Sequence, residues 1–228
     1  MKREYIHCHV IFCDQGESLP FFSRGSFVVG LFMFNPPRGV VGMRVIAGSA
    51  RGIRLKTVPG NRVRPTLDRA KETLFQVIGP YFDGGWVLDL FAGTGSLGIE
   101  ALSRGCDRAV FVDRSRASVQ TIRDNLQKTG FIERSEVHRE DVRSALRKLV
   151  RRGIRFRLVF LDPPYRENLL VPVLKKVAEI SLLRENGIVI AEHDFRLSPP
   201  DRVATLVAYR RLTFGEAAIT LYAPDADE

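Results

Sequence analysis

From residue 84 onward, short apolar strands alternate with amphipathic helical patterns, and this alternation limits the fold more than any other feature. The predicted strands cover residues 86–90, 109–112, 136–138, 158–161 and 188–191. Helical patterns lie between them, and several end at a glycine, which readily adopts the left-handed conformation that closes a helix. Strands that are almost entirely apolar and alternate with helices are typical of a parallel sheet with both faces covered. We therefore predict a doubly wound α/β domain.

The C-terminal part of the chain shows a different strand pattern. Residues 203–211 and 217–222 read as two strands joined across Gly215, which is typical of an antiparallel hairpin. Together with the five preceding strands, this hairpin predicts a seven-stranded, mostly parallel sheet with an antiparallel edge.

Composition divides the 228 residues into three parts. Residues 1–42 hold six of the fifteen phenylalanines, and glycines and prolines interrupt any regular periodicity there. Acidic residues break the apolar stretch that a signal peptide needs. We interpret residues 1–42 as a disordered or spurious leader with Met43 as the true start. We expect residues 43–83 to form an N-terminal extension, made of a hairpin and a helix with Thr66 as its N-cap, and residues 84–228 to form the main domain.

The net charge of +9 is high for a protein of this length. A basic excess of this size favours a polyanionic partner such as a nucleic acid. Three cysteines form no disulfide framework, which indicates a reducing compartment. No apolar stretch approaches the roughly 18 residues of a membrane span. We expect a cytoplasmic protein that binds no membrane and is a monomer. The tight spacing of His7, Cys8, His9 and Cys13 does not match an ordinary zinc site, so no metal is expected.

The residues Asp162, Pro163, Pro164 and Tyr165 directly follow the apolar run 158–161. Open α/β folds bind their ligands at the carboxyl ends of their strands, so this segment, 162–165, lies where a ligand is expected. It offers a carboxylate, backbone carbonyls and one aromatic ring. These groups suit a planar ligand with an NH₂ group, although Asp-Pro and Pro-Pro are also common in plain turns.

A glycine-rich turn follows the first strand and opens the next helix. Gly93, Gly95 and Gly98 satisfy the pattern of dinucleotide-binding folds. Asp89 at the strand end argues against a dinucleotide, because its carboxylate would repel a pyrophosphate and would attract a cationic group. Asp113 ends the second strand, where an acid can hold ribose hydroxyls. Asp141 follows the third strand and could accept a hydrogen bond from an adenine amino group or act as a helix N-cap.

In this order, the motifs resemble the class I S-adenosylmethionine-dependent amino-methyltransferases. Residues 43–228 more closely resemble the RsmD family, which methylates the exocyclic N2 of a guanine in bacterial 16S ribosomal RNA. The matching segments are 43–48, 64–69, 72–75, 89–95, 102–105, 159–165, 214–215 and 221–222. The family pattern lacks a leader such as residues 1–42.

The resemblance implies a Rossmann-like methyltransferase fold, S-adenosyl-L-methionine as the cofactor, and 16S ribosomal RNA as the partner, either naked or in an assembled small subunit. The implied catalytic residues are Asp162, Pro163, Pro164 and Tyr165. The implied cofactor-binding residues are Asp89, Phe91, Gly93, Gly95, Asp113, Asp141, Val142, Arg64 and Thr66. Glu192 and His193, just past the fifth predicted strand, are candidates for placing the guanine, but a surface role in a loop is the preferred interpretation.

Basic residues crowd the stretch before the main domain, which makes it the better candidate for a phosphate-binding face. The predicted RNA-binding residues are Arg44, Arg51, Arg54, Lys56, Arg62, Arg64, Arg69 and Lys71.

Four other functions compete with this prediction. A DNA amino-methyltransferase would share the 162–165 segment but normally needs a larger target-recognition region. A glutamine methyltransferase usually begins that segment with asparagine. A dinucleotide-dependent oxidoreductase would leave the segment unused, and a non-enzymatic RNA-binding module would explain only the charge.

Overall fold

The protein is described by a computed structural model that covers residues 43–58, 66–164 and 167–225, without the side chains of 66–68. The predicted leader, Arg62, Arg64, Tyr165 and the side chain of Thr66 lie outside these described residues.

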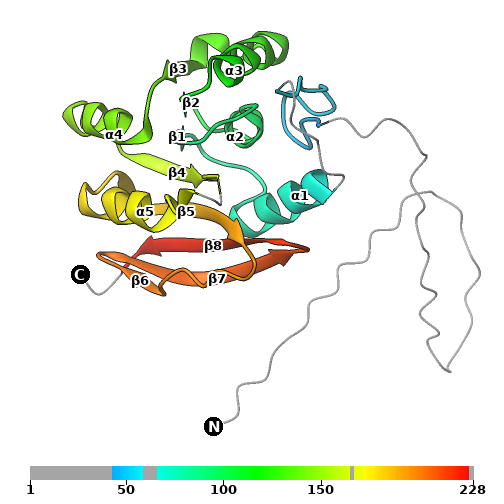
Figure 1. The fold of residues 1–228 in the computed structure, drawn as a ribbon. Coiled ribbons are helices and arrows are strands. Elements are labelled where there is room, and N and C mark those ends of the chain that lie inside the picture. Colours follow the sequence, from blue (N-terminus) through cyan, green and yellow to red (C-terminus); the bar gives the residue numbers. More distant parts are fainter. Residues whose placement is uncertain (1–42, 59–65, 165–166, 226–228) are drawn as a thin grey trace, which may run out of the picture. The chain divides into compact units, whose positions relative to one another are not determined.

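The main element is an eight-stranded sheet in the order β3-β2-β1-β4-β5-β8-β7-β6 (Figure 1). Strands β1 to β5 are parallel, and β6, β7 and β8 pair antiparallel at one edge. The strands are β1 (Trp86–Asp89), β2 (Arg108–Asp113), β3 (Ser135–Arg139), β4 (Phe156–Leu161), β5 (Leu183–Asp194), β6 (Arg202–Val203), β7 (Leu206–Phe214) and β8 (Ala217–Pro224). The predicted doubly wound, mostly parallel sheet with an antiparallel C-terminal hairpin is confirmed.

Helices cover both faces of the sheet (Figure 1). They are α1 (Thr66–Ile78), α2 (Ser96–Ser103), α3 (Arg116–Thr129), α4 (Val142–Arg151) and α5 (Leu170–Glu179), with a short 3-10 turn η1 (Ile132–Arg134). Apolar side chains of α1, α2 and α3 pack in one core cluster with residues 43–58. Side chains of α4 and α5 form a second cluster on the opposite face. This division decides which residues share a site, because alternate strand residues face opposite clusters.

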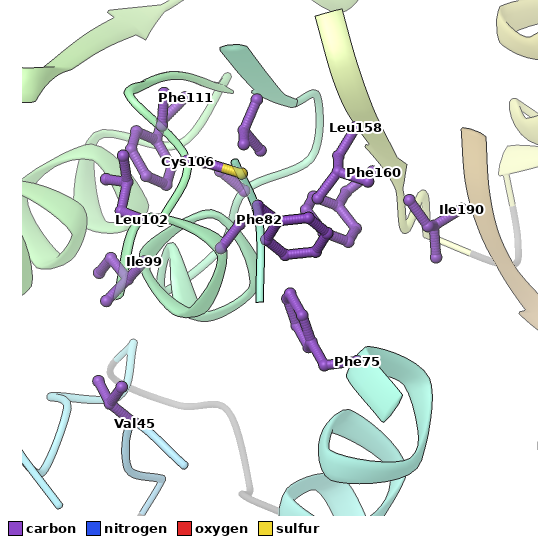
Figure 2. Packing of buried hydrophobic residues seen from close by; sticks show 14 of the residues in the cluster. Val45, Phe75, Phe82, Ile99, Leu102, Cys106, Phe111, Leu158, Phe160 and Ile190 are labelled. Atoms are coloured by element: carbon purple, nitrogen blue, oxygen red, sulfur yellow. The ribbon is translucent and has the colours of Figure 1, made fainter. Parts of the chain in front are cut away.

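Phe75 anchors α1 to the first of these clusters. Its ring centroid lies 6.1 Å from those of Phe82 and Phe160, and Figure 2 shows it directed from α1 toward the sheet. Aromatic pairs at this separation add packing energy beyond the area that they bury. The helix before the main domain is therefore part of the same core.

The structure differs from the sequence prediction in three places. The two-residue strand β6 adds an eighth strand at the sheet edge. Strand β5 reaches Asp194 rather than Ala191, because its C-terminal half pairs with β8. The predicted hairpin in the extension is reduced to one antiparallel bridge between Arg44 and Arg54. None of the described helices is long and apolar enough to cross a membrane.

A buried ionic cluster ties the extension to the main domain. Glu100 is fully buried in α2 and accepts hydrogen bonds from the backbone N–H groups of Ile46 (2.8 Å) and Ala47 (3.0 Å). The Arg104 Nε donates to Glu100 at 2.8 Å, and the Lys71 Nζ lies 3.2 Å from it. A buried carboxylate needs such partners, since an unpaired one would be very costly.

Lys71 also donates to the Arg44 carbonyl (2.6 Å) and to Ser96 Oγ (3.1 Å). An ammonium has three donors, and the buried Lys71 directs them at these two oxygens and at Glu100. The prediction that Lys71 contacts RNA is wrong, because its charge is directed into the protein.

Candidate active site

Acidic residues line up at the carboxyl edge of the parallel strands. Asp89 pairs in register with Phe160 of β4, so Asp162 follows two residues later on the same face. Leu161 pairs with Ala191 of β5, which places Asp162 beside Glu192. Phe160 packs in the cluster beneath α1, and alternation therefore directs Asp162 to that same side.

A cavity of about 250 Å³, which we call the main cavity because the predicted site residues line it, opens at this edge. The carboxyl-bearing residues Asp89, Asp162 and Glu192 line it, together with Phe91, Gly93 and Thr94 of the glycine-rich turn. Met43 and Thr57 of the extension and Leu74 of α1 close its other side. The extension and the sheet thus build one site jointly.

A second cavity of about 140 Å³ lies next to the first. Asp113, Asp141, Val142 and Pro164 line it. Phe91 and Asp162 line both cavities, so the two lie side by side. Two adjacent cavities suit a ligand with two parts.

The glycine-rich turn is shaped by left-handed backbone at Gly93 (φ +54°) and Gly95 (φ +76°). A Cβ added at Gly93 would meet only the Phe91 carbonyl, at 3.9 Å, so the turn leaves open space there. A Cβ at Gly98 would lie 2.4 Å from the Phe111 ring. Glycine at Gly98 therefore lets α2 approach β2 closely, whereas glycine at Gly93 keeps the cavity side open.

Backbone N–H groups hold two of the carboxylates in place. Gly93 and Ser115 donate to the two oxygens of Asp113 at 2.9 and 2.7 Å. Gly98 donates to Asp89 Oδ2 at 3.3 Å. Each carboxylate oxygen has a second lone pair, so both side chains can still accept hydrogen bonds from a ligand.

The acids of the main cavity disfavour each other's charge. Burial, with a smaller contribution from Asp113, raises the pKa of Asp89 to about 7. The Asp162 side chain is open to the cavity but lies deep among protein atoms, and this desolvation raises its pKa well above 3.8, with Glu192 and Asp89 adding to the effect. A bound cation would relieve this repulsion.

The structure brings most of the predicted cofactor residues together. Asp89, Phe91 and Gly93 line the main cavity, while Asp113, Asp141 and Val142 line the second. Gly95 is buried beneath the turn as the N-cap of α2. The Asp141 side chain caps α4 by accepting from the Arg143 N–H at 2.9 Å, so both roles considered for it remain compatible with its position.

Two sequence expectations for the end of β5 need correction. Glu192 and His193 lie within the strand, not in a loop. His193 is buried and contacts Thr220 Oγ1 at 2.9 Å and the Asp194 carbonyl at 2.8 Å. The side chain of Glu192, one residue earlier, points to the opposite face of the sheet and lines the main cavity. Strand alternation could have identified Glu192 from the sequence, because its side chain points to the same face of the sheet as that of Ile190, two residues earlier.

Of the predicted RNA-binding residues, those with described side chains on the surface are Arg44, Arg51, Arg54, Lys56 and Arg69. Lys56 pairs with Asp124 at 2.8 Å. Among the residues that the structure describes, no group of His, Cys, Asp and Glu side chains is arranged to hold a metal ion.

Comparison with known proteins places the chain among bacterial relatives. The family model described as "Conserved hypothetical protein 95" matches residues 43–223. YlbH of Bacillus subtilis is 46% identical over 180 residues, which cover 79% of this chain and 98% of YlbH. Ribosomal RNA small subunit methyltransferase D of Escherichia coli is 31% identical over 184 residues, which cover 81% of this chain and 91% of that protein.

Solved structures agree with the sequence relatives. The structure of yhhF from Escherichia coli superposes with a TM-score of 0.68 at 33% identity, covering 81% of this chain and 99% of that one. SMU.776, solved in complex with SAH, shares the fold at 12% identity, with a TM-score of 0.58, over 70% of this chain and 50% of that one. From the match over residues 43–223, the chain belongs to the Conserved hypothetical protein 95 family, the RsmD family that its sequence motifs resemble.

Proposed function

We propose that this protein transfers a methyl group from S-adenosylmethionine to the exocyclic N2 of a guanine in 16S ribosomal RNA. The observation that supports this most strongly is the convergence of Asp89, the open glycine-rich turn and Asp162 on one cavity. The relative from Escherichia coli is named as a small-subunit ribosomal RNA methyltransferase, which supports the class of substrate.

The side chains that line the two cavities fit this cofactor. The carboxyl groups of Asp89 and Asp162 line the main cavity, and a ligand with an ammonium and a sulfonium would stabilise their charged form, whereas a pyrophosphate would not. Asp113, held by two backbone N–H groups, can accept from ribose hydroxyls. Asp141 and Val142 line the second cavity, which suits the adenine.

Asp162 lies where both cavities meet, and this position suits the reacting amine. Its carboxylate accepts one N2–H, and the Pro163 carbonyl accepts the other, which directs the nitrogen lone pair toward the methyl group. Tyr165 stacks on the extruded base and offsets the few kcal/mol lost by unstacking it. Placing two bound reactants in line is worth roughly 7–11 kcal/mol in favourable cases.

When bound, the cofactor supplies a methyl group on a positively charged sulfur. Asp89, Asp113 and the glycine-rich turn would hold it; its sulfur would keep the electron pair of the S–C bond, and the methyl group would form the new bond to N2. N2 becomes acidic only as this bond forms, and it then loses one proton to the Asp162 carboxylate or to water. Asp162 therefore acts by orientation and need not be a strong base.

The activity is tested with small subunits from cells that lack the gene. Incubation with the protein and labelled S-adenosylmethionine should give N2-methylguanosine in 16S RNA, identified by nucleoside mass spectrometry. A different methylated nucleoside would contradict the assignment to N2, and no transfer would contradict the function. Thermal stabilisation by S-adenosylhomocysteine but not by NAD separates this function from an oxidoreductase.

A further inference from the structure

The main cavity contains one more acid than the proposed cofactor and the reacting amine require. Asp89 suits the cofactor's amino group and Asp162 suits the amine, whereas the proposed reaction gives Glu192 no role. Glu192 lies beside Asp162 because Leu161 pairs with Ala191 in the parallel register of β4 and β5. Both side chains line the same cavity, so one ligand group can meet both.

The surroundings of Glu192 make its hydrogen bonding selective. Ile190, two residues earlier on the same strand, and Ile219, its partner on β8, line the same part of the cavity. Apolar walls limit access of water. A polar ligand atom that finds no complementary hydrogen-bonding group at Glu192 therefore cannot form a hydrogen bond to water instead. A mismatch at Glu192 is therefore costly.

The amine-bearing bases differ at the ring nitrogen next to their amine. In guanine, N2 lies beside N1–H, which is a donor. In adenine and cytosine, the ring nitrogen next to the amine on the pairing edge is an acceptor with a lone pair. A carboxylate adjacent to the amine site accepts the guanine N1–H and repels the lone pair of the other two bases.

Resting on the proposed function, we propose that Glu192 selects guanine by accepting its N1–H while Asp162 accepts from the neighbouring N2 amine. The two adjacent carboxylates thus read two adjacent donors on one edge of the base. The mutual repulsion that helps to raise the Asp162 pKa agrees with this closeness.

The test replaces the guanine whose methylation has been mapped. RNA made by ligation carries guanine, 2-aminopurine or 2,6-diaminopurine at that position and is assembled into small subunits. Both analogues keep the 2-amino group, but their N1 is an acceptor. The wild-type protein should methylate them about 10- to 100-fold more slowly than guanine, the range expected when one base contact is lost.

Glu192→Gln supplies the complementary variant, because its amide can donate to an N1 acceptor. Its amide oxygen can still accept the guanine N1–H, so the variant should keep part of its activity on guanine while it gains activity on both analogues, and the preference for guanine should narrow. Glu185→Gln, on the exposed early part of β5, is the matched control and should keep the wild-type preference. Binding of S-adenosylhomocysteine and the unfolding midpoint should be unchanged in both variants.

Equal rates of the wild-type protein on all three bases would overturn the assignment, as would an unchanged preference in Glu192→Gln. Loss of S-adenosylhomocysteine binding in Glu192→Gln with the guanine preference intact would assign Glu192 to the cofactor instead. Failure of the wild-type protein to methylate the guanine-containing subunit would contradict the proposed function itself, so the two failures are distinguishable.

Discussion

At the scale of single residues, the buried carboxyl of Asp89 couples ligand binding to pH. Its pKa is about 7 in the folded protein instead of 3.8, so the folded state keeps a proton that the unfolded chain releases between about pH 4 and pH 7. Folding stability attributable to Asp89 therefore falls as the pH rises through that window. Above pH 7, the protein contains a buried, charged acid that a cationic ligand would stabilise.

We therefore expect Asp89→Asn to raise the free energy of unfolding at pH 8 by a few kcal/mol, since each pKa unit is worth about 1.4 kcal/mol. Near pH 4 the variant and the wild type should unfold alike. The affinity of the wild type for S-adenosylhomocysteine should fall by up to about tenfold per pH unit below pH 7, whereas the variant should bind weakly at every pH. Urea unfolding and calorimetric titration at several pH values measure both effects, and an equally steep profile in the variant would exclude Asp89 as the cause.

Asp162 should affect turnover rather than cofactor binding. Because it orients the amine, Asp162→Ala should lower kcat about 10²- to 10³-fold, the loss typical of removing one preorganised hydrogen-bonding group at a reacting atom. Methyl-transfer kinetics and S-adenosylhomocysteine titration separate the two effects. Wild-type turnover in this variant, with cofactor binding intact, would show that Asp162 does not orient the amine.

The sequence made Asp89, Asp113 and Asp162 predictable because each ends or follows an apolar strand, and parallel strands end at a common edge. Lys71 was misjudged although Leu74 and Phe75 follow it at helical spacing on a buried face. A lysine at such a position needs a buried partner, and Glu100 lies on another helix. Charge crowding along the chain does not reveal a pairing of that kind.

At the scale of elements, the buried Glu100 connects α1, α2 and the extension. Glu100→Gln would remove the negative charge that the ammonium of Lys71 and the guanidinium of Arg104 both contact. We expect it to lower the free energy of unfolding by roughly 3–5 kcal/mol, as for other broken buried ion pairs. Glu72→Gln, exposed on α1, changes the same functional group and should have an effect near zero.

Urea unfolding followed by circular dichroism measures this difference, and limited proteolysis should show earlier cleavage within residues 43–58 of Glu100→Gln. Equal stability of the two variants would show that the cluster does not hold the extension in place.

Element boundaries were less predictable than element types. The apolar runs predicted the cores of the parallel strands, since a strand buried on both faces reads as continuous hydrophobic sequence. The polar sequence around Asn186 and Gly187 hid the early part of β5, and the pairing of its later part with β8 lies outside any local pattern. The first and last residues of β5 are therefore set by pairing with strands distant in the sequence and not by local strand propensity.

At the scale of the whole molecule, the two faces of the sheet differ in what they offer RNA. The extension lies on the face of the main cavity, where Met43 and Thr57 line the site. Arg51 and Arg54 are exposed on this extension. Helix α4 packs on the opposite face and also exposes arginines, so net charge alone does not locate the RNA.

We expect the double charge reversal of Arg51 and Arg54 to glutamate to weaken binding to 16S RNA and to flatten its dependence on salt. Each lost phosphate contact should reduce the slope of log K against log salt by about 0.7 to 0.9. The same reversal at Arg147 and Arg151, exposed on α4, alters the net charge equally and should leave the slope nearly unchanged. Filter binding at several salt concentrations measures both variants. Equal salt slopes for the two variants would mean that the extension contributes only to the net charge. A larger reduction of the slope in the α4 variant would show that RNA binds on the opposite face.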